Sequence, residues 1–107
     1  MAKSFVNTGN ADGKVVVATT GDVVLDGKLY QDGDQVKDWG QAELSAGAEF
    51  SVKTPHTYRV VVNALFKDEG TADVNCSVGA KTKTEPLTGD ADDDGIDLEI
   101  AQFRIYS

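Results

Sequence analysis

The densest group of side chains able to do chemistry lies between residues 90 and 97, where aspartates recur at alternate positions and a glycine follows. A hard cation such as Ca²⁺ takes about six to eight oxygen ligands. Carboxylates at alternate positions can converge on one ion, and Gly95 allows the sharp turn that such a loop needs. A calcium loop in this segment would use Asp90, Asp92, Asp94, the backbone carbonyl of Ile96, and Asp97.

The same segment does not fit an EF-hand. The twelfth position of an EF-hand loop holds a bidentate Glu, but Ala101 stands there and Glu99 comes too early. The residues that follow alternate as a strand does, whereas an EF-hand continues into a helix. Two interpretations stay open. One is a calcium loop of a β-sandwich that uses Asp97 or Glu99; the other, which the incomplete ligand set favours, is an acidic, solvated hairpin loop.

Residues for nucleophilic catalysis or for a transition-metal site are scarce. His56 is the only histidine and Cys76 the only cysteine. Cys76 falls on the apolar side of an alternating segment, which is typical of a core residue rather than a nucleophile. Zinc needs several Cys and His ligands, and a phosphate loop needs Ser or Thr after its Lys, whereas Val15 follows Lys14. We therefore expect a non-enzymatic protein with no cofactor, apart from the calcium ion of the open interpretation.

The single tryptophan, Trp39, stands between an aspartate and a glycine in a polar context. An exposed Trp39 would be able to stack on a sugar ring, with Tyr30 and Tyr58 as further stacking candidates. Large aromatic side chains are mostly buried in folded proteins, however. We therefore favour an interior Trp39 that closes one end of the core.

The charge of the chain is negative and unevenly distributed. Its 107 residues include 18 acidic and 10 basic side chains, a formal charge of −8. Nucleic acids and anionic membranes require clustered Lys and Arg, so we expect neither as a partner. No apolar run reaches the length of a membrane span or of a signal peptide. Residues 84–99 hold seven acids and no base, a net charge of −7. The other residues hold 11 acids and 10 bases, a net charge of −1. The nearly neutral remainder is suited to packing against protein.

Apolar and polar residues alternate along most of the chain, at the period of two that indicates β-strands. Residues 57–66 show this most clearly, and residues 71–80 and 96–105 continue it. In the last segment the apolar positions change phase, so we expect a β-bulge near Ala101 and Gln102. With about seven or eight short strands, the chain is predicted to be all-β. It would form a single-domain antiparallel β-sandwich of jelly-roll type, or a small β-barrel, over residues 1–107.

The local predictions between these strands concern turns and helices. Hairpin turns are expected at the Asp-Gly pairs Asp12-Gly13, Asp26-Gly27 and Asp32-Gly33. Residues 42–53 are predicted to be a strand. No convincing helix is expected, and residues 35–44 are predicted to contain at most one short turn.

Two parts of the chain resemble known families. Residues 1–6 (MAKSFV), 21–24 (GDVV) and 46–52 (AGAEFSV) are similar to the small head-decoration, or capsid cement, proteins of tailed bacteriophages. Residues 57–62 (TYRVVV), 70–74 (GTADV), 96–100 (IDLEI) and 103–106 (FRIY) look like the closing strands of jelly-roll carbohydrate-binding modules. The second resemblance implies a sandwich with a structural calcium ion.

Each resemblance implies a function. The first implies a virion protein that decorates the capsid and docks on the major capsid protein or another virion protein. It would be made in the host cytoplasm without a signal peptide and would occur as a homo-oligomer or in repeated copies. Its expected contacts are residues 3–7 and 102–107, because strand edges offer unpaired backbone groups. The alternative is a calcium-dependent carbohydrate-binding module with Trp39, Tyr30 and Tyr58 at the sugar. A nucleic-acid mimic that uses the acidic segment ranks last.

Overall fold

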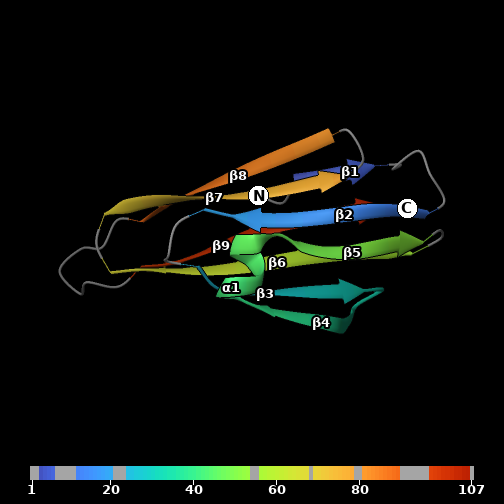
Figure 1. The fold of residues 1–107 in the computed structure, drawn as a ribbon, viewed down its shortest axis with the longest axis horizontal. Helices are drawn as coiled ribbons and strands as arrows, with labels where there is room; N and C mark the ends of the chain where they lie inside the picture. Colours follow the sequence, from blue (N-terminus) through green and yellow to red (C-terminus); the bar gives the residue numbers. More distant parts are fainter. Residues whose placement is uncertain are drawn as a thin grey trace.

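The computed structural model describes residues 3–6, 12–20, 24–53, 56–67, 69–78, 81–89 and 97–106, which form two β-sheets and one short helix (Figure 1). In chain order the elements are β1 (Lys3–Val6), β2 (Asp12–Thr19), β3 (Val24–Gln31), β4 (Asp34–Gly40), α1 (Gln41–Ala46), β5 (Ala48–Lys53), β6 (Thr57–Phe66), β7 (Gly70–Val78), β8 (Lys81–Gly89) and β9 (Asp97–Tyr106).

The two sheets have the strand orders β1-β9-β6-β3-β4 and β5-β2-β7-β8. The strand pairs are antiparallel except for β1 and β9, which run parallel to each other. The described strands close no barrel, so the all-β sandwich is confirmed and the barrel alternative is not. Most neighbours within a sheet are distant in sequence, because the chain repeatedly crosses from one sheet to the other.

Alternation along the central strands builds the core between the sheets. Along β6 every second side chain from Tyr58 to Phe66 is buried, and the residues between them are exposed or half-buried. Burial of one such side chain stabilises the fold by about 1.5–3 kcal/mol. The opposite sheet meets this face with Val15, Val17, Ala48, Phe50, Val52, Ala72, Val74, Cys76, Val78 and Leu87.

The short helix corrects the prediction of a continuous strand over residues 42–53. Residues 41–46 form α1, and the strand β5 begins only at residue 48. Leu44 is the buried residue of this helix, and α1 contacts both β2 and β3, one strand from each sheet. Gly47 follows with a φ of +99°, a conformation that glycine adopts without strain and that ends the helix. Residues 35–44, predicted to contain at most one short turn, form most of the strand β4 and the start of α1.

The three Asp-Gly pairs have different outcomes. Asp32 and Gly33 form the predicted hairpin turn between β3 and β4, with φ values of 52° and 93°. The predicted turns at Asp12-Gly13 and Asp26-Gly27 are wrong, because these pairs lie inside β2 and β3. A Cβ on Gly27 would lie only 3.1 Å from Leu44 Cδ1, so this glycine makes room for the helix side chain.

The predicted bulge in the last strand is also wrong. β9 pairs with β6 in one unbroken register, from Asp97 opposite Phe66 to Tyr106 opposite Thr57. Without an inserted residue, only one of the two apolar phases can face the core. Ala101, Phe103 and Ile105 do so, and the strand therefore turns Leu98 and Ile100 outward.

Candidate functional site

The predicted calcium ligands Asp90, Asp92, Asp94 and Ile96 lie outside the residues that the structure describes. Asp97 is the first residue of β9, and its side chain is likewise outside the described part. Among the residues that are described, no three His, Cys, Asp or Glu side chains are grouped as a metal site requires. The calcium loop stays a prediction.

The aromatic side chains proposed for sugar stacking need correction. Trp39 is 4% exposed and Tyr58 is 3% exposed. Both pack against Phe50, with ring centroids 5.9 Å apart in each case, and the backbone N–H of Lys53 donates a hydrogen bond to the Tyr58 hydroxyl. Trp39 thus has the interior position favoured above, and neither ring offers a face to a ligand. Only Tyr30 of the three is half-buried and lies on the outside of its sheet.

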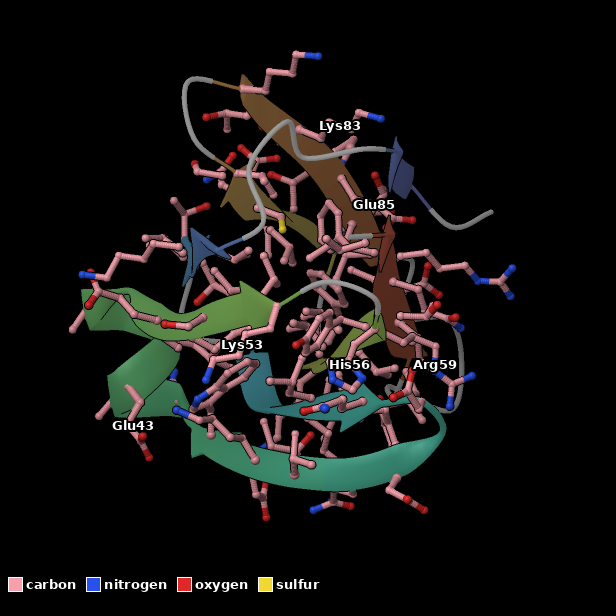
Figure 2. All side chains as sticks on the ribbon, turned by 90° about the vertical axis from the view of Figure 1, so that its right-hand side faces the viewer. Glu43, Lys53, His56, Arg59, Lys83 and Glu85 are labelled. Carbon is pink, nitrogen blue, oxygen red and sulfur yellow. The ribbon has the colours of Figure 1, made fainter. Side chains whose placement is uncertain are left out.

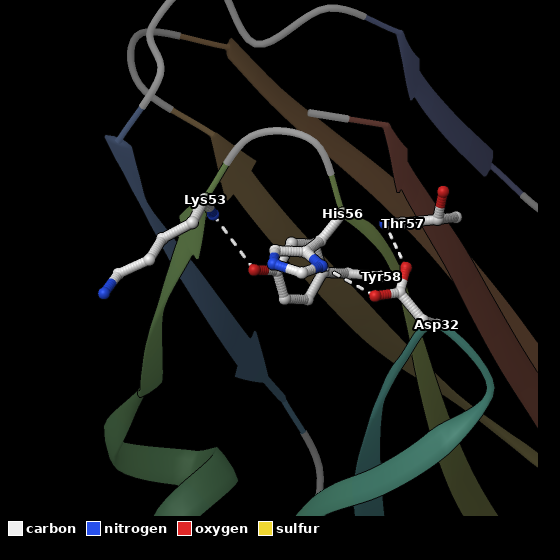
Figure 3. A network of polar contacts seen from close by, with 5 residues as sticks. All are labelled: Asp32, Lys53, His56, Thr57 and Tyr58. Atoms are coloured by element: carbon white, nitrogen blue, oxygen red, sulfur yellow. Dashed lines mark hydrogen bonds and ion pairs between the residues drawn. The ribbon is translucent and has the colours of Figure 1, made fainter.

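A polar network fastens the β3–β4 turn to the start of β6 (Figure 3). His56 Nδ1 lies 2.6 Å from Asp32 Oδ2, and the backbone N–H of Thr57 donates to Asp32 Oδ1 at 3.0 Å. The N–H of Asp32 donates in turn to the Thr57 carbonyl at 2.8 Å. The pKa of Asp32 is lowered, first by the hydrogen bond from Thr57 and then by His56. Both side chains are therefore engaged in holding the turn.

The single cysteine is a core residue. Cys76 is fully buried on β7, and burial raises the pKa of its thiol to about 12. A thiol that stays protonated at neutral pH is a poor nucleophile. The arrangement gives Cys76 a packing role and places its sulfur out of reach of solvent.

The outer face of β9 carries an apolar strip, formed by Leu98, Ile100 and Leu65. Leu98 is 54% exposed and Ile100 is 47% exposed. Leu65, half-buried on β6, stands opposite Leu98 in the strand pairing. The three side chains therefore form one continuous apolar surface across two neighbouring strands.

The edge of β9 beside this strip is incompletely covered. β1 pairs with β9 only at residues 103–106, and no other described strand pairs with residues 97–102 on that side. The N–H of Gln102 donates instead to a side chain of the other sheet, Glu85 Oε2 on β8, at 3.0 Å. Glu85 is labelled in Figure 2. Backbone groups alternate in direction along a strand, so those of Leu98 and Ile100 point to the same side as those of Gln102.

The pairing gives the two terminal segments different outcomes: β1, within residues 3–7, is the outermost described strand of its sheet, as expected, whereas the C-terminal segment is corrected. Residues 103–106 are not an unpaired edge, because β6 lies on one side of them and β1 on the other. Among the described residues, β9 itself lacks a paired strand on that side only along residues 97–102, where Glu85 of β8 contacts it at Gln102.

A second surface feature lies at the opposite end of β9, on the same outer face. Tyr30 on β3, Arg59 on β6 and Arg104 on β9 stand opposite one another in register. The guanidinium carbon of Arg59 lies 4.7 Å from the centre of the Tyr30 ring. These residues line a pocket of about 280 Å³ together with Gly33, Thr57 and Tyr58. Sequence analysis did not single out the arginines, since only the pairing of β6 with β9 brings them together.

Comparison with known proteins found no relative of this chain. No family model, no curated protein and no solved structure matches it. Among the described residues, no helix is long and apolar enough to span a membrane.

Proposed function

We propose that this chain is a non-enzymatic structural protein that docks on a larger protein assembly through the first half of β9. The observation that carries the proposal is the pair of half-exposed aliphatic side chains, Leu98 and Ile100, on a strand whose adjacent edge is unpaired among the described residues. An exposed apolar strip next to open backbone groups is a surface that another protein can cover, by packing on the strip or by adding a strand.

The class of partner comes from the resemblance of residues 1–6, 21–24 and 46–52 to head-decoration proteins of tailed phages. The proposed role is accordingly a capsid decoration or accessory protein, present in repeated copies on the major capsid protein. Its action is geometric: it buries apolar surface on a partner and thereby stabilises the shell.

The size of the apolar contribution follows from the exposed fractions. Full burial of a Leu or Ile side chain is worth about 1.5–3 kcal/mol, and each of these two has about half of its surface still to bury. Covering both would contribute about 2 kcal/mol, a change of roughly thirtyfold in affinity. Backbone hydrogen bonds to the open edge would each add about 0.5–1.5 kcal/mol. One charged substitution in the strip is therefore enough to weaken the docking measurably.

The test is co-sedimentation with undecorated capsids built from the major capsid protein encoded in the same genome. The unchanged protein is expected to sediment with the capsids and to raise their resistance to heat, and the variant Leu98→Lys is expected to lose both. Val36→Lys is the matched control, because Val36 is equally exposed (50%) but lies on β4, at the far edge of the sheet.

Two results would overturn the proposal. One is an unchanged protein that stays in the supernatant at every capsid concentration. The other is equal binding by Leu98→Lys and the unchanged protein, which would remove β9 from the interface.

A further inference from the structure

The row formed by Tyr30, Arg59 and Arg104 brings two positive charges together on the surface of a chain whose net charge is −8. Like charges directly opposite each other on neighbouring strands destabilise a sheet. Both arginines are exposed, and within the described residues neither forms an ion pair. Apart from the contact of Arg59 with the Tyr30 ring, no contact between described residues accounts for the juxtaposition of the two arginines.

The pocket next to the row supplies a shape for a ligand. Its lining joins Arg59 and Arg104 with Tyr30, the turn residue Gly33 and the start of β6. Arg59 lies against the Tyr30 ring, which limits the freedom of its side chain before any ligand arrives. Asp32, which belongs to the same turn as Gly33, has its two carboxylate oxygens bonded to His56 and Thr57. Both oxygens are thus occupied within the turn, and the lowered pKa of Asp32 keeps its negative charge.

We propose that this pocket binds a carboxylate group through Arg59 and Arg104. The planar fork of a guanidinium matches the two oxygens of a carboxylate, and such charge-assisted pairs are the strong ones among hydrogen bonds. The pocket is small, so it takes one such group and a few neighbouring atoms rather than a large ligand. This binding goes beyond docking through the apolar strip and does not depend on it.

The charge of the whole chain favours a carboxylate over a phosphate. A phosphate monoester carries nearly two negative charges at neutral pH, and a carboxylate carries one. The repulsion from the remaining acidic side chains grows with the charge of the ligand. Arg59, Arg104 and the ionised Asp32 of the adjoining turn together carry one positive charge, which a carboxylate balances and a dianion exceeds. The carboxylate comes either from an acidic residue of a partner protein or from a free small acid, and the recognition chemistry is the same.

The experiment is an NMR titration of the ¹⁵N-labelled protein at constant ionic strength. The probes are the blocked peptide acetyl-Gly-Glu-Gly-amide, the same peptide with Gln in place of Glu, sodium acetate and inorganic phosphate. The Glu peptide is expected to shift the amide signals of Gly33, Thr57, Arg59 and Arg104, and the Gln peptide is expected to leave them in place. If the Glu peptide binds more tightly than acetate, the carboxylate comes from an acidic residue of a partner protein. Equal affinities of the two probes identify a free acid as the source.

Substitution separates binding from folding. Arg104→Gln is expected to lower the affinity for the Glu peptide by about tenfold or more, because a hydrogen bond to a charged group is lost. The same variant should unfold at the temperature of the unchanged protein or slightly above it, because a like-charge pair has been removed. Lys81→Gln is the matched control: it removes one positive charge from an exposed position on the other sheet and should leave the affinity unchanged.

Three results would overturn the carboxylate site. They are an absence of shifts with the Glu peptide and acetate alike, tighter binding of phosphate than of either carboxylate, and equal weakening by Lys81→Gln and Arg104→Gln.

Discussion

The last residue of β8, Gly89, is buried against the ring of Phe66 at the end of β6. A Cβ added at Gly89 would lie 2.0 Å from Cγ, 2.3 Å from Cδ1 and 2.4 Å from Cβ of Phe66. Carbon atoms in ordinary contact are about 3.5–4.0 Å apart. The atoms that collide are close to the backbone of β6, so a change of rotamer at Phe66 cannot move all of them away. Gly89→Ala must therefore shift the backbone at the end of β8 or of β6.

The expected magnitude follows from this overlap. Overpacking a core typically lowers the free energy of unfolding by about 1–3 kcal/mol. Here the added Cβ would lie within 2.4 Å of three atoms of Phe66, so the loss belongs at or above the upper end of that range. We therefore expect Gly89→Ala to lower the free energy of unfolding by about 3 kcal/mol or more. Since 1 kcal/mol shifts the melting temperature of a domain of this size by about 4–8 °C, Gly89→Ala should melt about 12 °C lower or more.

Gly70 provides a matched control. It lies directly opposite Gly89 in the pairing of β7 with β8, and a Cβ there would be 3.8 Å from Phe66 Cδ1, an ordinary contact. Gly70→Ala should therefore leave the stability within about 0.5 kcal/mol of the unchanged protein. Urea unfolding followed by the fluorescence of the buried Trp39 measures both variants. The packing of Phe66 on Gly89 would be refuted if the two alanine variants unfolded at the same urea concentration.

Three further predictions concern the helix, the turn and the cysteine. Leu44→Ala should cost about 2–5 kcal/mol of unfolding free energy in the same urea assay, because Leu44 is the buried side chain of α1; a loss below about 1 kcal/mol would contradict the packing of the helix. The pKa of Asp32 is lowered in the folded protein, so its ionised form contributes stability above its unfolded pKa of about 3.9, and this contribution disappears as the pH falls through the folded pKa. The melting temperature of Asp32→Asn should therefore lie below that of the unchanged protein at pH 7, and the gap should close on acidification; a constant gap would contradict the network with His56. Cys76 should resist alkylation by iodoacetamide in the folded protein at pH 8 and react once urea unfolds the chain, and rapid reaction of the folded protein would contradict its burial.

Alternation alone was sufficient to predict the sandwich. In residues 57–66 one apolar face recurs at a strict period of two, and only a strand can bury such a face. The same rule failed in the last strand, where two apolar phases compete. The structure resolves the competition in favour of Phe103 and Ile105 and leaves Leu98 and Ile100 outside. The sequence alone does not show this choice, because it depends on which side chains of the opposite sheet face each position of β9.

Packing between distant segments also decided the helix and the surface features. Residues 41–46 fit a strand pattern, but Leu44 reaches the core from a helical turn above Gly27, a residue of β3. Arg59 and Arg104 each occupy a polar position in an alternating segment. Charged residues are common at such positions, so neither arginine stands out in the sequence. Their juxtaposition depends on the register of β6 with β9, which a single sequence does not specify.

Amide hydrogen exchange, compared between the free protein and the protein bound to undecorated capsids, tests docking through β9 most directly. Contact with the apolar strip and the open edge predicts slower exchange on binding in residues 97–102 and no change in β5, which lies at an edge of the other sheet. Slower exchange confined to β5, or to β4 at the far edge of the same sheet, would contradict docking through β9.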